Sequence, residues 1–466
     1  MPPAATRPPG VERLLAAVRP RLAGQRDHAP LLAAARELIA DERARIAAGA
    51  PGRNLAELAT ELSERLERLA DPGESGLMPV INATGVILHT NLGRAPWPAA
   101  AIAAGAAAAA GYSLLELDRH NGRRGPRFRV AEEHLIALTG AEDGLIANNN
   151  AAALVLAVGL AGRGGGVAVS RGELVEIGGG VRIPEIIRRS GARLVEVGTT
   201  NRTRAADFAA ALATGRIRAV LRVHPSNFAM SGFTEMPDPA EVARLAHDQD
   251  AIVIDDLGSG ALLPTERFGL AHEPMPSERL AAGADLVTFS GDKLVGGPQA
   301  GLIAGRADLV ARIRRDPLAR ATRPDKVSLA ALGATLALYR AGLATTEIPV
   351  WRMLAAAAGP IRSRAEAIRS DLDPDQRGRV SIEATLATIG GGSLPGETLP
   401  SFGLTVRGGS AERLLGALRR GDPCVIGRIH DGALVLDLRT VEPDDDAALG
   451  AALGAALGAA LGAAPG

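Results

Sequence analysis

The chain has 466 residues and a mass of 47.8 kDa, which is enough for two or three domains and excludes a small single module. Hydrophobic residues make up 47% of the chain, so a wholly disordered protein is not expected. The 52 basic residues balance 52 acidic ones, so a strongly basic protein that coats nucleic acid is not expected either. Because only 2% of the residues are aromatic, the core must be built mainly from Ala, Leu, Val and Ile.

The chain carries no pattern typical of export or membrane insertion. Cys424 is the only cysteine, so no internal disulfide can form, and the opening segment MPPAATRPPG lacks a charged region followed by an apolar one. The blandest stretches, near 99–110 and from 447 onward, are rich in Ala and Gly rather than in Leu and Ile. We therefore expect a cytoplasmic protein without a membrane span.

Residues 1–80 are expected to form a small helical domain with a linker. Asn54 and Glu57 have the spacing of a capping box, and further helices are predicted near 11–22 and 31–47. One apolar face of the last helix is marked by Leu55, Leu58, Leu62, Leu66 and Leu69. Eleven arginines balance eleven acidic residues here, so a nucleic-acid site would depend on arrangement rather than net charge. A packing or oligomerisation domain is the alternative.

Residues 81–340 alternate between short apolar runs and Ala/Leu/Arg-rich helical stretches. Candidate strands are 144–147, 167–170, 194–197, 219–223, 251–255, 286–290 and 301–304. Such alternation predicts an α/β domain with a mostly parallel sheet covered on both faces. Functional groups of such a domain gather at the strand ends.

The remainder of the chain is predicted to contain an α+β domain and a tail. Residues 341–443 combine helical stretches, including 346–372 and 411–420, with strand-like segments near 380–389, 402–406 and 424–441. Residues 444–466 repeat the motif AALG and are of low complexity. This tail is expected to fray, with an Ala/Leu helix as the alternative.

Two of the predicted strands end in polar residues that are able to serve one site. Asn148, Asn149 and Asn150 lie between a strand and a helix, where free backbone N–H groups favour an anion such as phosphate. The alternative is that these residues only cap the helix. Asp255 and Asp256 end another strand beside a Gly-rich turn, and capping is the alternative there too.

The segment DLVTFSGDKLVGGPQAGLIAG ends a third strand and contains Lys293. Lys293 and Lys326 are the only lysines in the chain, and an amine forms a Schiff base that a guanidinium cannot form. The order Asp, Ser, Lys along these strand ends is typical of a pyridoxal phosphate site, in which Asp supports the ring nitrogen, Ser holds phosphate and Lys forms the aldimine. Lys326 follows Asp325 at a predicted helix start, so a structural or backbone-capping role is expected for it.

Seven runs are more specific than a general pyridoxal phosphate pattern: INATGVILHTNLGRAPW, NNNAAALVLAV, SRGELVEIGGGVRIPEI, GTTNRT, HPSNFAMSGFTE, DDLGSGALLP and SGDKLVGGPQAG. Together they resemble the bacterial selenocysteine synthases, the L-seryl-tRNA(Sec) selenium transferases, over nearly the whole chain except the AALG tail. The resemblance implies a fold-type-I pyridoxal phosphate-dependent transferase with a helical N-terminal domain that binds the selenocysteine tRNA. It also implies a homo-oligomer, a ring of dimers, with a decamer as the expected form.

The resemblance further implies roles for individual residues. Lys293 stands at the Schiff-base position, and the neighbouring Asp292 at an active-site position where it would orient Lys293 or a substrate group. The implied cofactor contacts are Asp256, rather than Asp255, to the ring nitrogen, Asn227 to the ring hydroxyl, and Asn149, Asn150 and Ser290 to the phosphate.

Three arginines and one histidine complete the set of candidates. Arg94, Arg320 and Arg323 match family positions that line an anion pocket, although each one alone is more typical of a surface or ion-pair residue. His224 either approaches the cofactor ring or is a satisfied histidine at a strand end. The eight histidines are scattered and the cysteine count gives no zinc spacing, so no metal site is predicted.

The implied reaction converts seryl-tRNA(Sec) to selenocysteinyl-tRNA(Sec) with selenophosphate as the selenium donor. Serine displaces Lys293 from the aldimine, its hydroxyl is lost by β-elimination, and selenium adds to a dehydroalanyl-tRNA. Two alternatives remain. One is a pyridoxal phosphate-dependent lyase or transaminase acting on a free amino acid, and the other is a catalytically silent tRNA-binding or assembly protein.

Overall fold

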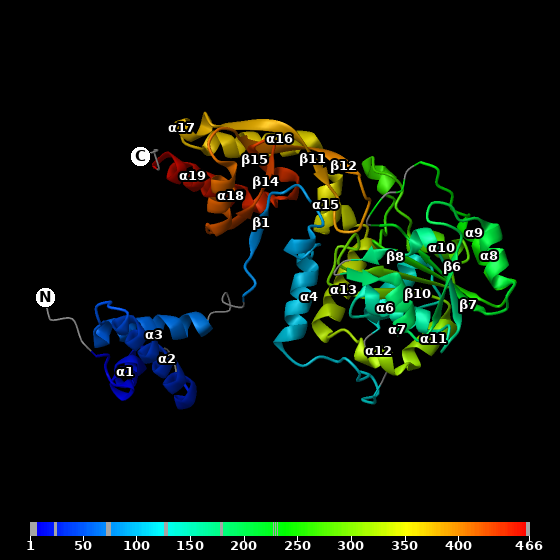
Figure 1. Cartoon of the computed structure of the whole chain (residues 1–466), viewed down its shortest axis with the longest axis horizontal. Helices are drawn as coiled ribbons and strands as arrows, with labels where there is room; N and C mark the ends of the chain where they lie inside the picture. Colours follow the sequence, from blue (N-terminus) through cyan, green and yellow to red (C-terminus); the bar gives the residue numbers. More distant parts are fainter. Residues whose placement is uncertain are drawn as a thin grey trace. The chain divides into compact units, whose positions relative to one another are not determined.

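The computed structural model describes residues 7–22, 26–70, 76–124, 129–177, 180–226, 228, 230 and 232–462. The chain divides into two compact units, residues 1–79 and residues 80–466 (Figure 1). Each unit has its own apolar core.

The N-terminal unit is built from the helices α1 (Val11–Val18), α2 (His28–Ala47) and α3 (Leu55–Ala70), with a short 3-10 turn at Arg19–Arg21. The predicted capping box is confirmed: Asn54 Oδ1 accepts from the Glu57 N–H at 3.0 Å, and Glu57 Oε2 accepts from the Asn54 N–H at 2.7 Å. The apolar face of α3 packs against α1 and α2, with Leu58 and Leu62 fully buried.

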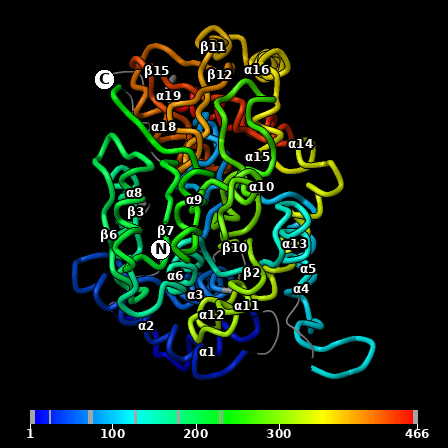
Figure 2. The backbone as a smooth tube through the Cα atoms, turned by 90° about the vertical axis from the view of Figure 1, so that its right-hand side faces the viewer, coloured from blue at the N-terminus to red at the C-terminus, as the bar shows by residue number. Residues whose placement is uncertain are grey.

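A seven-stranded sheet forms the centre of the second unit. Its strand order is β2-β10-β9-β8-β7-β3-β6. The strands are β2 (Asp143–Ala147), β3 (Gly166–Ser170), β6 (Arg193–Val197), β7 (Ile217–Val223), β8 (Ile252–Gly258), β9 (Leu286–Ser290) and β10 (Gly301–Gly305). All neighbouring pairs are parallel except those of β10, which runs antiparallel to β9 and β2. In Figure 2, β6 and β2 lie toward opposite edges of this sheet.

Apolar helix faces cover both sides of the sheet. One side packs against α6 (Asn150–Gly159), α7 (Ile183–Arg189) and α11 (Ala307–Arg315). The other side packs against α5 (Val130–Thr139), α8 (Ala205–Leu212), α9 (Pro239–His247), α10 (Pro276–Ala281) and α13 (Lys326–Arg340). In β8, Val253 belongs to one core and Ile254 to the other, as the alternation of strand side chains requires. The predicted α/β class is confirmed.

Shorter elements surround this sheet. Helix α4 (Ala99–Ala110) packs on α13, and α12 (Pro317–Ala321) follows α11. The others are α14 (Ala344–Glu347), α15 (Pro349–Ala355), the two-stranded pair β4 (Glu176–Ile177) and β5 (Val181–Arg182), and short 3-10 turns at Thr90–Leu92, Arg171–Glu173 and Thr265–Phe268.

The C-terminal part of this unit carries a four-stranded antiparallel sheet of order β11-β12-β15-β14. Its elements are β11 (Val380–Thr388), β12 (Thr398–Val406), β14 (Arg428–His430), β15 (Ala433–Asp437), α16 (Ala358–Asp371), α17 (Pro374–Arg377) and α18 (Ala411–Arg420). The helical stretch predicted over 346–372 breaks between α15 and α16, because Pro360 fits only the first turn of a helix. Strand β1 (Val80–Asn82) pairs in parallel with β13 (Cys424–Ile426).

The AALG repeat forms α19 (Asp446–Gly462). Leu449, Leu453 and Leu457 recur every four residues on one face and are fully buried in the C-terminal core. Of the two expectations for this segment, the helical one therefore describes residues 446–462. No helix in the described ranges is long and apolar enough to cross a membrane.

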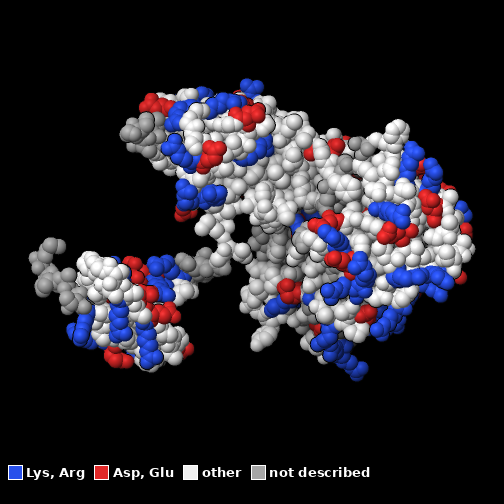
Figure 3. Space-filling view, viewed as in Figure 1, with Lys and Arg blue, Asp and Glu red and all other residues white. Residues whose placement is uncertain are grey.

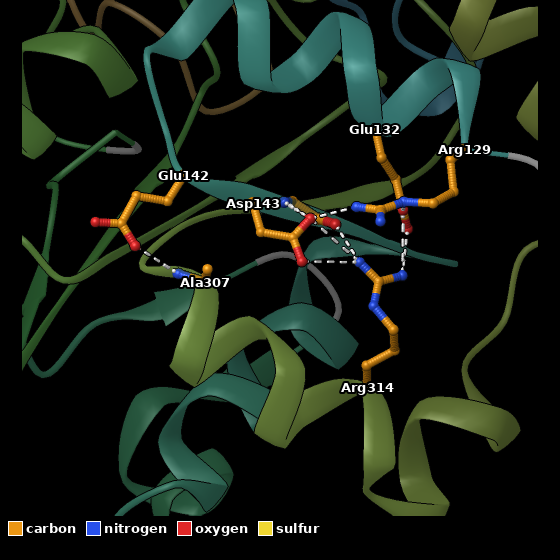
Figure 4. A network of polar contacts seen from close by, with 7 residues as sticks. Arg129, Glu132, Glu142, Asp143, Ala307 and Arg314 are labelled. Atoms are coloured by element: carbon orange, nitrogen blue, oxygen red, sulfur yellow. Dashed lines mark hydrogen bonds and ion pairs between the residues drawn. The ribbon is translucent and has the colours of Figure 1, made fainter. Parts of the chain in front are cut away.

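A network of ion pairs fixes the edge strand β2 (Figure 4). Glu132 of α5 accepts from Arg129 Nε at 2.9 Å and from Arg314 Nη1 of α11 at 3.0 Å. Arg314 Nη2 also donates to the Gly144 carbonyl at 2.7 Å, and Arg129 pairs with Asp143. These contacts join α5, β2 and α11, and so set the point at which the chain enters the asparagine segment after β2.

Candidate functional site

A cavity of about 190 Å³ opens at the carboxyl ends of β7, β8 and β9. Side chains from β8, β9 and the segments after β2 and β7 meet there. Its lining includes seven of the predicted site residues: Arg94, Asn149, Asn150, Asp256, Ser290, Asp292 and Lys293. The strand ends that the sequence singled out therefore converge on one place.

Lys293 lies three residues beyond β9 in a tight turn, with Nζ 3.5 Å from the Gly392 carbonyl oxygen. Burial lowers the pKa of the Lys293 amine, and the nearby Arg94 guanidinium acts in the same direction. The carboxylates of Asp256 and Asp292 oppose this shift. The amine is therefore neutral, and nucleophilic, over a wider pH range than an ordinary lysine.

Asp256 is held in place by two hydrogen bonds to one carboxylate oxygen. Asn150 Nδ2 donates to Oδ1 at 2.8 Å and Thr288 Oγ1 donates to it at 2.9 Å. Burial raises the pKa of Asp256, and these two hydrogen bonds oppose the rise. The neighbouring Asp255 does not line this cavity, so of the two adjacent carboxylates Asp256 is the one that faces Lys293's site.

The asparagine segment caps α6 at the cavity wall. Asn149 Oδ1 accepts from the Ala152 N–H at 2.9 Å, so this side chain serves as the N-cap. Asn150 is the first helical residue, and its own Oδ1 is buried without a partner among the described residues. The helix N-terminus and Ser290, at the end of β9, together offer donors to an anion.

Arg94 is placed by a left-handed turn and an ion pair. Gly93 and Arg94 have φ values of 90° and 63°, and Arg94 Nη1 lies 2.6 Å from Asp292 Oδ2. The Ala95 N–H also donates to the Asp292 carbonyl at 3.3 Å. The loop that follows β1 is thus fastened to the residue next to Lys293, which brings a guanidinium to the cavity.

Three predicted site residues are not in this cavity lining. Arg320 and Arg323 are exposed, and Arg323 Nη1 lies 3.6 Å from Glu116 Oε1. Asn227 lies outside the described residues. Lys326 donates from Nζ to the Gly111 carbonyl, which confirms the backbone-capping role expected for it.

His224, for which the sequence left two roles open, lines the cavity, donates its backbone N–H to the Asp256 carbonyl at 2.9 Å and has its ring Nε2 3.3 Å from Glu273 Oε1. Two other residues that shape the site, Thr288 and Glu273, were not predicted from the sequence. Thr288 lies two residues before Ser290 and therefore on the same face of β9, a spacing visible in the sequence. Glu273 follows no local pattern and is brought in only by the fold.

The residues fit pyridoxal phosphate, which needs an amine for its aldehyde, an acid for its ring nitrogen and donors for its phosphate. Lys293, Asp256 and the start of α6 supply these groups. Gly258 adopts φ +68°, and a Cβ there would lie 3.7 Å from Lys293 Nζ and 3.2 Å from Ser226 Oγ. The missing side chain keeps the space beside the amine open. Fold and cavity together define a fold-type-I enzyme of the pyridoxal phosphate-dependent class.

Comparison with known proteins supports the assignment to the pyridoxal phosphate-dependent class and identifies a family within that class. The structure of D-glucosaminate-6-phosphate ammonia-lyase has a similar fold, with a TM-score of 0.59 and 24% sequence identity over 83% of this chain and 98% of that one. The family model of L-seryl-tRNA selenium transferase matches residues 80–442.

Full-length relatives give the same result. The L-seryl-tRNA(Sec) selenium transferase of Moorella thermoacetica is 45% identical over 95% of this chain and 94% of its own length. That of Rhizobium meliloti is 43% identical over 94% of both chains. The chain belongs to the L-seryl-tRNA selenium transferase family.

The electrostatics of the cavity predict how the Lys293 amine titrates. In cofactor-free protein, Lys293 should react with an acylating reagent with an apparent pKa below the ordinary lysine value of about 10.4. Arg94→Gln removes a positive charge and should raise that pKa, whereas Asp256→Asn removes a negative charge and should lower it. Mass spectrometry of the labelled Lys293 peptide over a pH series measures both shifts. Shifts of the opposite sign would contradict the proposed electrostatic effects of Arg94 and Asp256 on the Lys293 amine.

Proposed function

We propose that the chain is a pyridoxal phosphate-dependent L-seryl-tRNA(Sec) selenium transferase that forms selenocysteinyl-tRNA(Sec). The observation that carries the proposal is the meeting of Lys293 and Asp256 in one cavity of a chain that belongs to this family. The proposal includes selenophosphate as the selenium donor, a cytoplasmic location, and a homo-oligomeric ring of dimers, with a decamer as the expected form.

The residues of the cavity would hold the cofactor at three points. The N–H groups at the start of α6, with Asn149, Asn150 and Ser290, would bind the phosphate. Asp256 would hold a proton on the ring nitrogen, and an ionised carboxylate there is favoured by the bonds from Asn150 and Thr288. The proposed contact of Asn227 with the ring hydroxyl completes the set.

Pyridoxal phosphate, when bound, supplies an electron sink for the α-carbon of an amino acid. Lys293 would bind the cofactor through its amine and then move the proton at the serine α-carbon, for which a lowered amine pKa is required. Asp292 would keep Arg94 oriented through their 2.6 Å ion pair. The Arg94 guanidinium would in turn bind the anionic selenium donor.

Arg320 and Arg323 remain part of the proposal as residues that bind the anionic substrate. Both are exposed in the single chain and absent from the cavity lining. Their contribution therefore requires either the proposed oligomer or a movement of the segment that carries them.

The two lysines give a matched test of the catalytic assignment. With serine-charged selenocysteine tRNA and selenophosphate, Lys293→Ala should lose at least about 10²–10⁴-fold in conversion because the proton-transferring amine is gone. Lys326→Ala removes the same kind of group outside the cavity and should keep the activity. Mass spectrometry of the aminoacyl product measures the outcome.

Retained activity in Lys293→Ala would overturn the assignment. Absence of conversion in a wild-type protein that holds the cofactor would instead favour a lyase or transaminase acting on a free amino acid.

The N-terminal unit has a surface suited to the backbone of a tRNA. Figure 3 shows basic side chains in neighbouring rows on its visible face. Its acidic residues are partly committed to ion pairs: the buried Glu42 binds Arg45 and Arg53. Exposed arginines without a carboxylate partner among the described residues are Arg7, Arg13, Arg19, Arg21, Arg36, Arg43 and Arg68. Guanidiniums that no carboxylate neutralises bind phosphates by displacing counterions.

The proposed tRNA contact predicts a charge-specific loss of affinity. Arg36 and Arg43 lie two turns apart on one side of α2, and their joint replacement by Gln should weaken binding of the selenocysteine tRNA and reduce its salt dependence. Arg65→Gln is the control, because Arg65 is already paired with Glu37. Filter binding over a salt series measures both. Equal losses of affinity in the two variants, or equal binding of every tRNA, would argue against specific recognition.

Deletion of residues 1–70 should abolish binding of the selenocysteine tRNA, while binding of the cofactor remains.

A further inference from the structure

A second cavity lies beside the first, on the other side of the β7 and β8 strand ends. Its volume is about 270 Å³, and the two cavities share the wall formed by Val223, His224 and Pro225. Besides Asp256, which lines both cavities, its charged lining comes from Glu173, Arg222, Asp255 and Arg279. None of these four lines the first cavity, so the catalytic assignment leaves them without a role.

The charged groups of the second cavity are incompletely paired. Arg222 Nη1 and Arg279 Nε lie 3.8 Å and 3.7 Å from the same oxygen, Asp255 Oδ2. These are ion pairs without hydrogen bonds, and neither guanidinium donates a hydrogen bond to another residue in the described ranges. Asp255 Oδ1 and Glu173 Oε2 are likewise buried without a partner there.

Burial of such incompletely paired groups is energetically unfavourable unless a ligand or water in the cavity forms hydrogen bonds with them. Buried polar groups in proteins are nearly always hydrogen-bonded, and an unpaired one costs about 1–3 kcal/mol. Two guanidiniums with free N–H groups face a space far larger than the roughly 30 Å³ that one water occupies. Of the three carboxyl groups in the lining, Asp256 is bonded to Asn150 and Thr288, and burial raises the pKa of Glu173 to about 8. Near neutral pH this leaves the Asp255 carboxylate alone opposite two guanidiniums.

We propose that this second cavity binds a small tetrahedral oxyanion, such as sulfate or phosphate, between the guanidiniums of Arg222 and Arg279. Guanidinium groups bind such oxygens through paired N–H donors, and two of them on different elements, β7 and α10, meet an anion from two sides. The two guanidiniums exclude a cation as the occupant. The inference goes beyond the proposed function and does not depend on it.

Glu173 adds a donor that depends on pH. Burial raises its pKa to about 8, and Arg222, Asp255 and Arg279 are the charged groups that face it. Near neutral pH the protonated carboxyl donates a hydrogen bond to an anion. Above its pKa it carries a negative charge that repels the anion, so affinity should fall as the pH rises through about 8.

The test is equilibrium dialysis of radiolabelled sulfate against the cofactor-loaded protein, in which the cofactor's own phosphate already occupies the first cavity. Arg279→Gln should weaken binding roughly tenfold or more, because a charge-assisted contact is lost. Arg279→Lys, which keeps the charge, should restore part of the affinity. The control Arg244→Gln removes an exposed guanidinium that is paired with Asp248 outside both cavities, and it should bind sulfate as the wild type does.

Thermal melting shows whether each variant is folded. Should Arg279→Gln fail to fold, Glu173→Gln tests the same cavity: it stays neutral, so the loss of sulfate affinity through about pH 8 should disappear. Acetate in excess should compete poorly, since a carboxylate offers fewer acceptor directions than a tetrahedral oxyanion.

Three results would overturn the inference. They are no saturable sulfate binding by the wild type, equal binding by wild type and Arg279→Gln, or a loss that Arg244→Gln shares. If acetate competed with sulfate equally well, the cavity would be a carboxylate site rather than a site for a tetrahedral oxyanion, and the inference would be wrong. All of these measure binding rather than turnover, so they are distinct from a failure of the transferase assay.

Discussion

The burial of opposite charges at the ends of β8 and β9 is the constraint on which the rest of the site depends. An isolated lysine or aspartate would shed its charge in such surroundings, as the pKa directions of Lys293 and Asp256 show. Asn150 and Thr288 counteract this tendency at the carboxylate through hydrogen bonds from α6 and β9. Those two elements are fixed by the doubly covered sheet, so the reactivity of one amine rests on the packing of the whole domain.

The pleat of β8 turns adjacent carboxylates to opposite faces of the sheet, so that Asp256 reaches the cavity around Lys293 and Asp255 lines only the second cavity. Asp256 bonds to Asn150 on the α6 side, whereas Asp255 meets Arg279 of α10 on the opposite side. His224, at the end of the neighbouring strand, borders both cavities and bonds through its backbone to Asp256. Two sites of different charge, one around an amine and one around guanidiniums, can therefore stand side by side in the same sheet.

Local patterns in the sequence predicted the elements well, and long-range contacts explain what they missed. All seven strands of the large sheet, the Asn54 capping box and the position of Lys293 follow from periodicity, turn residues and residue type. The Arg94–Asp292 pair joins residues almost 200 positions apart, and Glu273 reaches His224 only through the fold. Arg320, which the family resemblance also suggested for the site, is exposed in the single chain. Such placements depend on tertiary packing, which no local pattern encodes.

We propose that the cavity around Lys293 takes pyridoxal phosphate through that amine. The most direct measurement is borohydride reduction of the cofactor-loaded protein, followed by digestion and mass spectrometry of the two lysine-containing peptides. We expect a pyridoxyl group on Lys293 and none on Lys326, whose amine is hydrogen-bonded to the Gly111 carbonyl outside the cavity. A pyridoxyl group on Lys326, or on neither lysine of a folded protein, would contradict it.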